Sequence, residues 1–209
     1  MASSPATTER HPRARRADAV RNRDKLIAAA RDAFAQDGTA TSLEDIARRA
    51  GVGIGTLYRH FPARVDLLEA IYIDEVEALC ASAARVADLP PWDALIGWLH
   101  AFTRYVATKQ AFAAELFAHL GEDAAVLRSC RVAVYAAGEP LLERAQQAGV
   151  VRSDTSFTEV IQLVGGIAKI TSAEPPEIER ILDVALDGLR YKSQARSTKT
   201  ARQAQGEDL

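Results

Sequence analysis

Apolar residues recur at helical spacing along most of the chain. Positions i, i+3, i+4 and i+7 share one face of a helix, whereas a half-buried strand alternates apolar and polar residues, and no such window occurs here. The pattern therefore predicts an all-α fold. The expected helices cover residues 22–36, 43–50, 54–60, 64–86, 92–108, 110–120, 123–147, 156–171 and 176–192.

Glycine, proline and small polar residues separate these segments. Asp37-Gly38 closes the first helix, since glycine tolerates the left-handed conformation past a helix end, and Leu89-Pro90-Pro91 is the clearest break. We place a domain boundary near residue 66, inside the long helix that precedes this break. The organisation expected is a disordered basic arm (1–20), a first helical domain (21–66), a second helical domain (67–192) and a disordered tail (193–209).

Composition narrows the class of protein. Hydrophobic residues make up 48% of the 209 residues and charged residues 26%, which suits a globular chain with a sizeable core. No run approaches the ~18–20 uncharged apolar residues of a membrane span, and no apolar run follows the N-terminal arginines as in a secretory signal. Cys80 and Cys130 are too few for a disulfide framework or a Cys-rich metal site. We therefore expect a protein of the reducing cytoplasm that has no membrane partner.

The net charge of −2 hides an asymmetry along the chain. Residues 1–64 hold 12 Lys/Arg and 7 Asp/Glu, whereas residues 65–209 hold 14 Lys/Arg and 21 Asp/Glu. A basic N-terminal third indicates that this part meets a polyanion. Uneven surface charge without any partner explains the same numbers equally well.

The block TSLEDIARRAGVGIGTLYRHF, residues 41–61, has the form of a helix-turn-helix. Its two short helices are joined by three residues that include glycine, and small residues at Ala47 and Gly51 allow the helices to cross closely. Val52 and Leu57 would fill the space between them. The second helix is then held for entry into a major groove, and its exposed face carries four donor side chains. These are Thr56, Tyr58, Arg59 and His60.

The starts of two helices offer anion sites in the same region. A helix N-terminus presents free N–H groups and a partial positive charge, so Thr41 and Ser42 are expected phosphate anchors. Arg64 opens the next long helix and would reach a phosphate with its guanidinium. The plainer alternatives are that Ser42 only caps its helix, with Asp45 as partner, and that Tyr58 only packs.

This block resembles the N-terminal DNA-binding domain of the TetR family of bacterial transcriptional regulators. The resemblance spans about residues 22–72, a third of the chain. It implies an all-helical regulator that binds operator DNA as a homodimer and takes a small effector in its C-terminal domain. The matching positions are Thr41, Ser42, Leu43, Ile46, Ala47, Ala50, Gly51, Val52, Thr56, Leu57, Tyr58, His60, Phe61, Arg64, Leu67 and Leu68.

One departure from the family pattern lies at the start of the second helix of the motif. The family often has Ser or Thr after A-G-V, but here Gly53 is followed by the apolar Ile54. One phosphate contact is therefore missing. Ile54 would instead touch a thymine methyl group, and glycine is an acceptable N-cap.

Other motifs give no reason to expect catalysis. Gly51-Val52-Gly53-Ile54-Gly55 follows a helix and lacks the last glycine of a dinucleotide loop. Glu115 and His119 share a helix face, but no spacing ties His100 to them as metal ligands. No nucleophile elbow or Cys–His pairing is present. We expect neither a metal nor a cofactor, and we expect that the protein is not an enzyme.

Aromatic residues concentrate just after the proline break. Six of the 13 lie between residues 92 and 117, where they would line a ligand cavity or simply pack a core. The family resemblance favours a cavity for an unknown effector, which the aromatic lining suggests is apolar or aromatic. The expected ligand-binding residues are Trp98, Phe102, Tyr105, Phe117, His119 and Leu120.

The last two predicted helices carry wide apolar stripes, and Gly165-Gly166 lies inside the first of them. Glycine destabilises a helix by about 1 kcal/mol relative to alanine, so close approach of another helix is its expected reason. By resemblance, these helices would form a four-helix interface with a second copy; an intrachain core is the alternative. The interface residues expected are Phe157, Val160, Ile161, Val164, Gly165, Ile167, Ile181, Leu182, Ala185 and Leu189.

The sequence thus predicts a ligand-responsive repressor that binds a pseudo-palindromic operator as a homodimer. An effector acts through its different affinity for two conformations of the protein. The competing interpretation is a helical small-molecule-binding or interaction protein that does not act on DNA.

Overall fold

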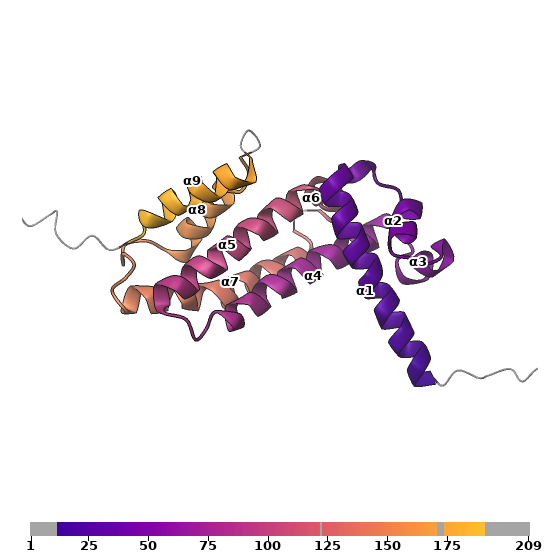
Figure 1. The fold of residues 1–209 in the computed structure, drawn as a ribbon, viewed down its shortest axis with the longest axis horizontal. Helices are drawn as coiled ribbons and strands as arrows, with labels where there is room; N and C mark the ends of the chain where they lie inside the picture. Colours follow the sequence, from indigo (N-terminus) through magenta and orange to yellow (C-terminus); the bar gives the residue numbers. More distant parts are fainter. Residues whose placement is uncertain (1–11, 122, 171–173, 191–209) are drawn as a thin grey trace, which may run out of the picture. The chain divides into compact units, whose positions relative to one another are not determined.

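The computed structural model describes residues 12–121, 123–170 and 174–190, which are largely helical (Figure 1). This part of the chain contains no β-strand, only an isolated bridge between Val151 and Arg190. The prediction of an all-α fold is therefore confirmed. The elements are α1 (Pro12–Asp37), the 3-10 helix η1 (Gly38–Ala40), α2 (Leu43–Arg49), α3 (Ile54–His60), α4 (Arg64–Arg85), α5 (Pro91–Gln110), α6 (Ala113–Leu120), α7 (Ala125–Gln147), α8 (Phe157–Ile167) and α9 (Pro175–Asp187).

Of the two ends predicted to be disordered, only residues 12–20 lie in the described part of the chain. Residues 1–11 of the arm and the whole tail, 193–209, lie outside the described residues. For the rest of the arm the prediction is wrong, because α1 begins at Pro12 and not at Asn22. The expectation depended on an apolar stripe, and the Arg-rich first turns of α1 carry none. No helix in the described part of the chain is both long enough and apolar enough to cross a bilayer.

The first of two compact units holds the predicted helix-turn-helix. It comprises the described residues up to Glu75 together with those of 108–128. α1 contacts both α2 and α3. One apolar centre joins these helices, because Leu26 and Phe34 of α1, Ile46 of α2 and Leu57 of α3 are each at most 1% exposed. The two short helices therefore have a fixed orientation on α1.

α6 belongs to this same unit. The ring of Phe112, just before α6, lies 6.3 Å from that of Phe34. The ammonium of Lys109 lies 5.0 Å from the ring centroids of both Tyr72 and Phe117. These contacts explain why a segment so distant in sequence joins the N-terminal helices.

Ion pairs link the middle of α4 to α1 in the same unit. Arg31 of α1 forms ion pairs with Asp74 and Glu75 of α4. Burial raises the pKa of Glu75, and the neighbouring Arg31 partly offsets this rise. The units divide after Glu75, so the first unit reaches further along α4 than the boundary that we expected near residue 66.

The second unit comprises residues 76–107 and the described residues from Ser129 onward. Its core is an aromatic cluster around Trp98, whose ring centroid lies 5.8 Å from that of Phe102 and 5.8 Å from that of Phe157. Tyr135 meets Phe157 edge to face at 5.2 Å. Gly138 of α7 faces this cluster, and a Cβ there would lie 2.4 Å from the Trp98 ring. Glycine is therefore needed for the close approach of these rings to α7.

Candidate nucleic-acid interface

α2, a tight turn and α3 form the helix-turn-helix at the predicted place. Gly51 has φ +65°, a left-handed conformation that glycine adopts without strain. The N–H of Val52 donates to the carbonyl of Ala47 at 3.0 Å and closes the turn. Ile46 of α2 and Leu57 of α3 are fully buried. The turn and the buried pair together fix the direction in which α3 points.

Ser42 caps α2 as the sequence indicates. Its Oγ accepts from the backbone N–H of Asp45 at 3.1 Å, while Ser42 itself stays exposed. At the start of α3, Gly53 is the N-cap and provides no side-chain hydrogen bond. As expected from the sequence, no side chain caps the start of α3.

Thr41 and Arg64 are engaged inside the unit instead of facing outward. The Thr41 side chain is buried, and its hydroxyl donates toward the carbonyl oxygens of Gly38 (3.1 Å) and Ala33 (3.3 Å). Arg64 Nη1 donates to the carbonyl of Thr41 at 2.6 Å, and its Nε donates to Glu115 at 2.7 Å. These partners give both residues a role in positioning the start of α2, and their contact with DNA phosphates stays a prediction.

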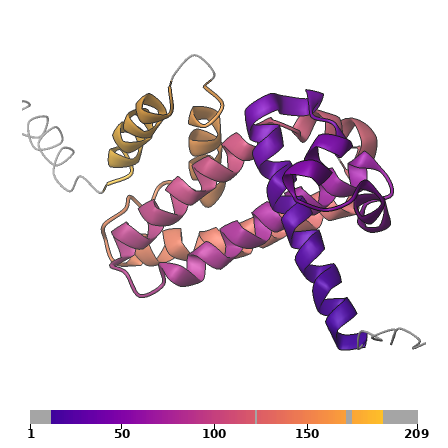
Figure 2. The same cartoon turned by 45° about the vertical axis from the view of Figure 1, so that its right-hand side comes forward.

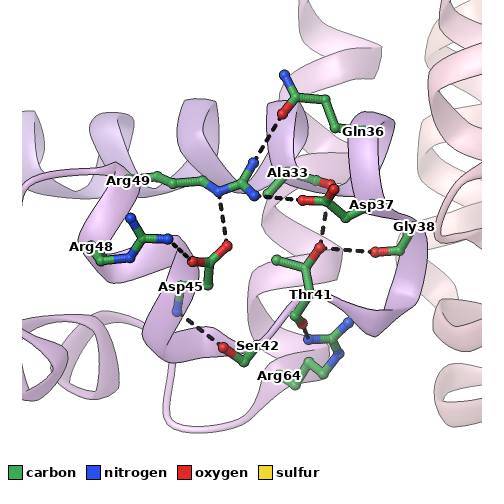
Figure 3. A network of polar contacts seen from close by, with 10 residues as sticks. All are labelled: Ala33, Gln36, Asp37, Gly38, Thr41, Ser42, Asp45, Arg48, Arg49 and Arg64. Atoms are coloured by element: carbon green, nitrogen blue, oxygen red, sulfur yellow. Dashed lines mark hydrogen bonds and ion pairs between the residues drawn. The ribbon is translucent and has the colours of Figure 1, made fainter.

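An arginine–carboxylate network joins α2 to the end of α1 (Figure 3). Arg49 of α2 pairs with Asp45 at 2.9 Å and with Asp37 at 2.5 Å, and it donates to Gln36 at 3.1 Å. Arg48 also pairs with Asp45. Hydrogen bonds from these two arginines, that from Arg48 foremost, lower the pKa of Asp45. The network keeps Asp45 charged and adds polar contacts to the apolar packing of α2.

Sequence reasoning missed this network and the Arg64 contact. The spacing of Asp45 with Arg48 and Arg49 was a readable signal, since residues three and four apart are neighbours on a helix. Glu115 lies 51 residues from Arg64, and no local pattern joins them.

The outer face of α3 brings three of the predicted DNA contacts together. Ile54 is 38% exposed and Tyr58 is 45% exposed, one helical turn apart. Arg59 is exposed, and its Nε donates to the carbonyl of Gly55 at 3.2 Å. Thr56 and His60 are half-buried, and the His60 ring lies 6.2 Å from that of Phe61. α3 thus presents apolar and donor groups side by side, the mixture that base edges and phosphates require.

The expected ligand-binding residues fall into two sets. Trp98, Phe102 and Tyr105 lie in the aromatic cluster of the second unit and are buried. Phe117, His119 and Leu120 lie on α6 in the first unit, where His119 is exposed with Nδ1 2.9 Å from the carbonyl oxygen of Glu115.

One polar atom in the first of these sets lacks a partner. Trp98 is fully buried, and its Nε1 has no acceptor among the described residues. An unpaired buried N–H costs free energy that an acceptor would recover. The described residues contain no group of His, Cys, Asp and Glu side chains suited to a metal ion.

The expected dimer-interface residues divide between a core and a surface. Within a single chain Phe157, Val160, Val164, Ile167, Leu182 and Leu189 are buried, as the alternative of an intrachain core requires. Ile161, Gly165, Ile181 and Ala185 are half-buried.

The outer faces of α8 and α9 expose large apolar residues that the sequence interpretation did not select. Leu163 is 42% exposed and Val184 is 75% exposed. A shallow groove on α9 is lined by Glu177, Arg180, Ile181 and Val184. Among the described residues, no atom outside the neighbouring backbone of α8 comes within 4 Å of a Cβ placed on Gly166.

Family models match both parts of the chain. Residues 26–71 match the model described as bacterial regulatory proteins, tetR family. Residues 90–191 match the C-terminal domain of SbtR-like transcriptional regulators.

Solved structures are similar over most of the chain. A TetR transcriptional regulator of Streptomyces coelicolor is 41% identical with a TM-score of 0.71, over 82% of this chain and 99% of that one. A TetR transcription regulatory protein of Mycobacterium vanbaalenii is 33% identical with a TM-score of 0.68, over 84% of this chain and 99% of that one.

Curated relatives match over a shorter stretch. An HTH-type transcriptional regulator of Staphylococcus aureus is 36% identical over 73 residues, and the HTH-type transcriptional repressor KstR of Mycolicibacterium smegmatis is 40% identical over 72 residues. Each match covers 34% of this chain, and they cover 38% and 35% of those proteins. The chain thus spans little more than a third of the length of the curated relatives it matches.

Proposed function

The chain belongs to the TetR family of bacterial transcriptional regulators, and from this premise we propose that it is a homodimeric repressor released from its operator by a small effector. The observation that carries the proposal is the outer face of α3, where Ile54, Tyr58 and Arg59 are exposed on a helix that its buried face holds in place. A helix in this setting fits the major groove of B-DNA.

Each exposed group on α3 has a role in this proposal. Ile54 contacts a thymine methyl, and Arg59 donates to a guanine edge or a phosphate. Tyr58 donates to a phosphate, as do Thr56 and His60 at the margin of the face. Ser42, at the start of α2, lies beside the DNA backbone. The two positioning residues, Thr41 and Arg64, hold that start against α1 and α6.

A gel-shift experiment with the DNA upstream of the protein's own gene tests the proposal. A specific complex that survives excess random DNA supports operator binding. Random DNA at low salt is the control for the basic face, because phosphate contacts bind any sequence there. Absence of binding to both DNAs would favour the alternative of a helical protein that does not act on DNA.

The homodimer proposal places the contact on the outer faces of α8 and α9. Leu163 and Val184 are too exposed for residues of their size, and Gly166 leaves space for another helix. Changing Val184 to Glu should convert the dimer to a monomer, since it places a charge in an apolar interface. Sedimentation velocity measures this. Val20→Glu on α1 is the control, because it changes an equally large exposed residue in the other unit; an unchanged dimer in Val184→Glu would contradict this interface.

The effector proposal centres on the indole of Trp98. An apolar or aromatic compound with one hydrogen-bond acceptor would satisfy its Nε1. In a Trp92→Phe variant Trp98 is the sole tryptophan, so its emission reports binding directly. Compounds that shift this emission should also lower operator affinity, and operator should lower theirs by the same factor. Compounds that shift the emission and leave operator affinity unchanged would contradict the coupling.

A further inference from the structure

The upstream half of α1 continues beyond the core of its unit. Leu26 is the first buried residue of α1, and none of residues 16–25 is buried. At a rise of 1.5 Å per residue, Pro12 lies about 21 Å along the helix axis from Leu26. Figures 1 and 2 show this half as a rod that leaves the other helices of its unit.

This half carries arginine on the face that is apolar downstream. Positions spaced by four and three residues share one side of a helix. Following that spacing, Ile27, Ala30 and Phe34 are buried. The same stripe continues upstream through Arg23, Val20 and Arg16, which are all exposed. The face of α1 that packs onto its unit downstream thus carries two exposed cations upstream.

These two arginines have no partners of their own in the described part of the chain. Arg21 pairs with Asp18, but neither Arg16 nor Arg23 forms a hydrogen bond or ion pair with another described residue. An apolar helix partner would not suit a stripe with two guanidinium groups. The groups stand seven residues apart, about 10 Å along the axis, which is close to three base-pair steps of a DNA backbone.

We propose that Arg16 and Arg23 bind DNA phosphates just outside the half-site that α3 contacts. The charge of this surface and its place on the helix that supports α2 and α3 point to DNA over any other partner. The proposal rests on the proposed function, because it requires the operator as ligand. Contacts of this kind add affinity and fix register, but they leave sequence preference unchanged.

Operator affinity measured against salt concentration tests the proposal, with Arg16→Gln/Arg23→Gln compared with wild type. Glutamine keeps the helix propensity and removes the charge. Each lost phosphate contact flattens the slope of log affinity against log salt by about 0.9. The double variant should therefore flatten it by about 1.8 per subunit, or about 3.6 for a homodimer, and weaken binding by at least about tenfold at 0.15 M salt. Circular dichroism should show unchanged helix content, and the hydroxyl-radical footprint should shorten at both ends.

Lys25→Gln is the matched control, because Lys25 is exposed on the opposite side of the same helix. It should change the slope much less than the double variant. An equal change would overturn the assignment to one face. A double variant with the wild-type slope and footprint would overturn the inference and leave the proposed function intact. Failure of the wild-type protein to bind any operator would instead overturn the proposed function itself.

Discussion

Replacing Tyr58 and Arg59 together by alanine should lower operator affinity about 100-fold or more, since a base or phosphate contact contributes about 1–3 kcal/mol. Both side chains are exposed on α3, so their loss leaves no cavity. Helix content and oligomeric state should match wild type. Fluorescence anisotropy with labelled operator measures the affinity.

A matched arginine on the second unit provides the control for that experiment. Arg85 is exposed near the end of α4, and Arg85→Ala removes the same charge away from α3. It should leave operator affinity near the wild-type value. Normal affinity in both single variants, Tyr58→Ala and Arg59→Ala, would count against α3 as the contact surface.

Gly138→Ala should destabilise the protein by about 1–3 kcal/mol, the usual range for overpacking a core. The added Cβ would lie 2.4 Å from the ring of Trp98 and 2.5 Å from the ring of Phe157. Neither ring is free to shift, because both are buried in one cluster. This loss outweighs the gain of about 1 kcal/mol in helix propensity from glycine to alanine. Urea unfolding followed by circular dichroism measures the difference.

Gly97→Ala is the counterpart within the same unit. A Cβ on Gly97 would meet only a methyl of Val86, at 3.4 Å, which is an ordinary contact. This variant should therefore keep or exceed the wild-type stability, by up to about 1 kcal/mol. Equal stability changes in the two variants would contradict the close packing of Trp98 and Phe157 on α7.

Local signals in the sequence predicted most of the fold. Helix boundaries at Gly51 and Ser42 follow from turn and capping chemistry that acts within a few residues, and the structure has both. The upstream half of α1 escaped prediction because periodicity detects only helices that bury a stripe. Within residues 1–20 the exposed Arg16 occupies that stripe, so the pattern resembled a disordered arm.

Contacts between distant residues were beyond local patterns. Arg64 was expected to reach a phosphate because it opens a helix in a basic region, yet Glu115 and the Thr41 carbonyl engage it. Spacing also cannot say which side of an apolar stripe faces its own chain. Phe157 and Val164 belong to the intrachain core, whereas Val184, outside the selected stripe, is the exposed residue.

Methylation interference on a selected operator tests most directly whether α3 enters the major groove. Duplexes selected from random DNA provide the site, and dimethyl sulfate modifies guanine N7 in the major groove and adenine N3 in the minor groove. Guanine N7 methylation should block binding in two half-sites related by a dyad, and the Tyr58→Ala/Arg59→Ala variant should select no site. Interference confined to adenine N3, or the same site selected by wild type and variant, would contradict major-groove binding by α3.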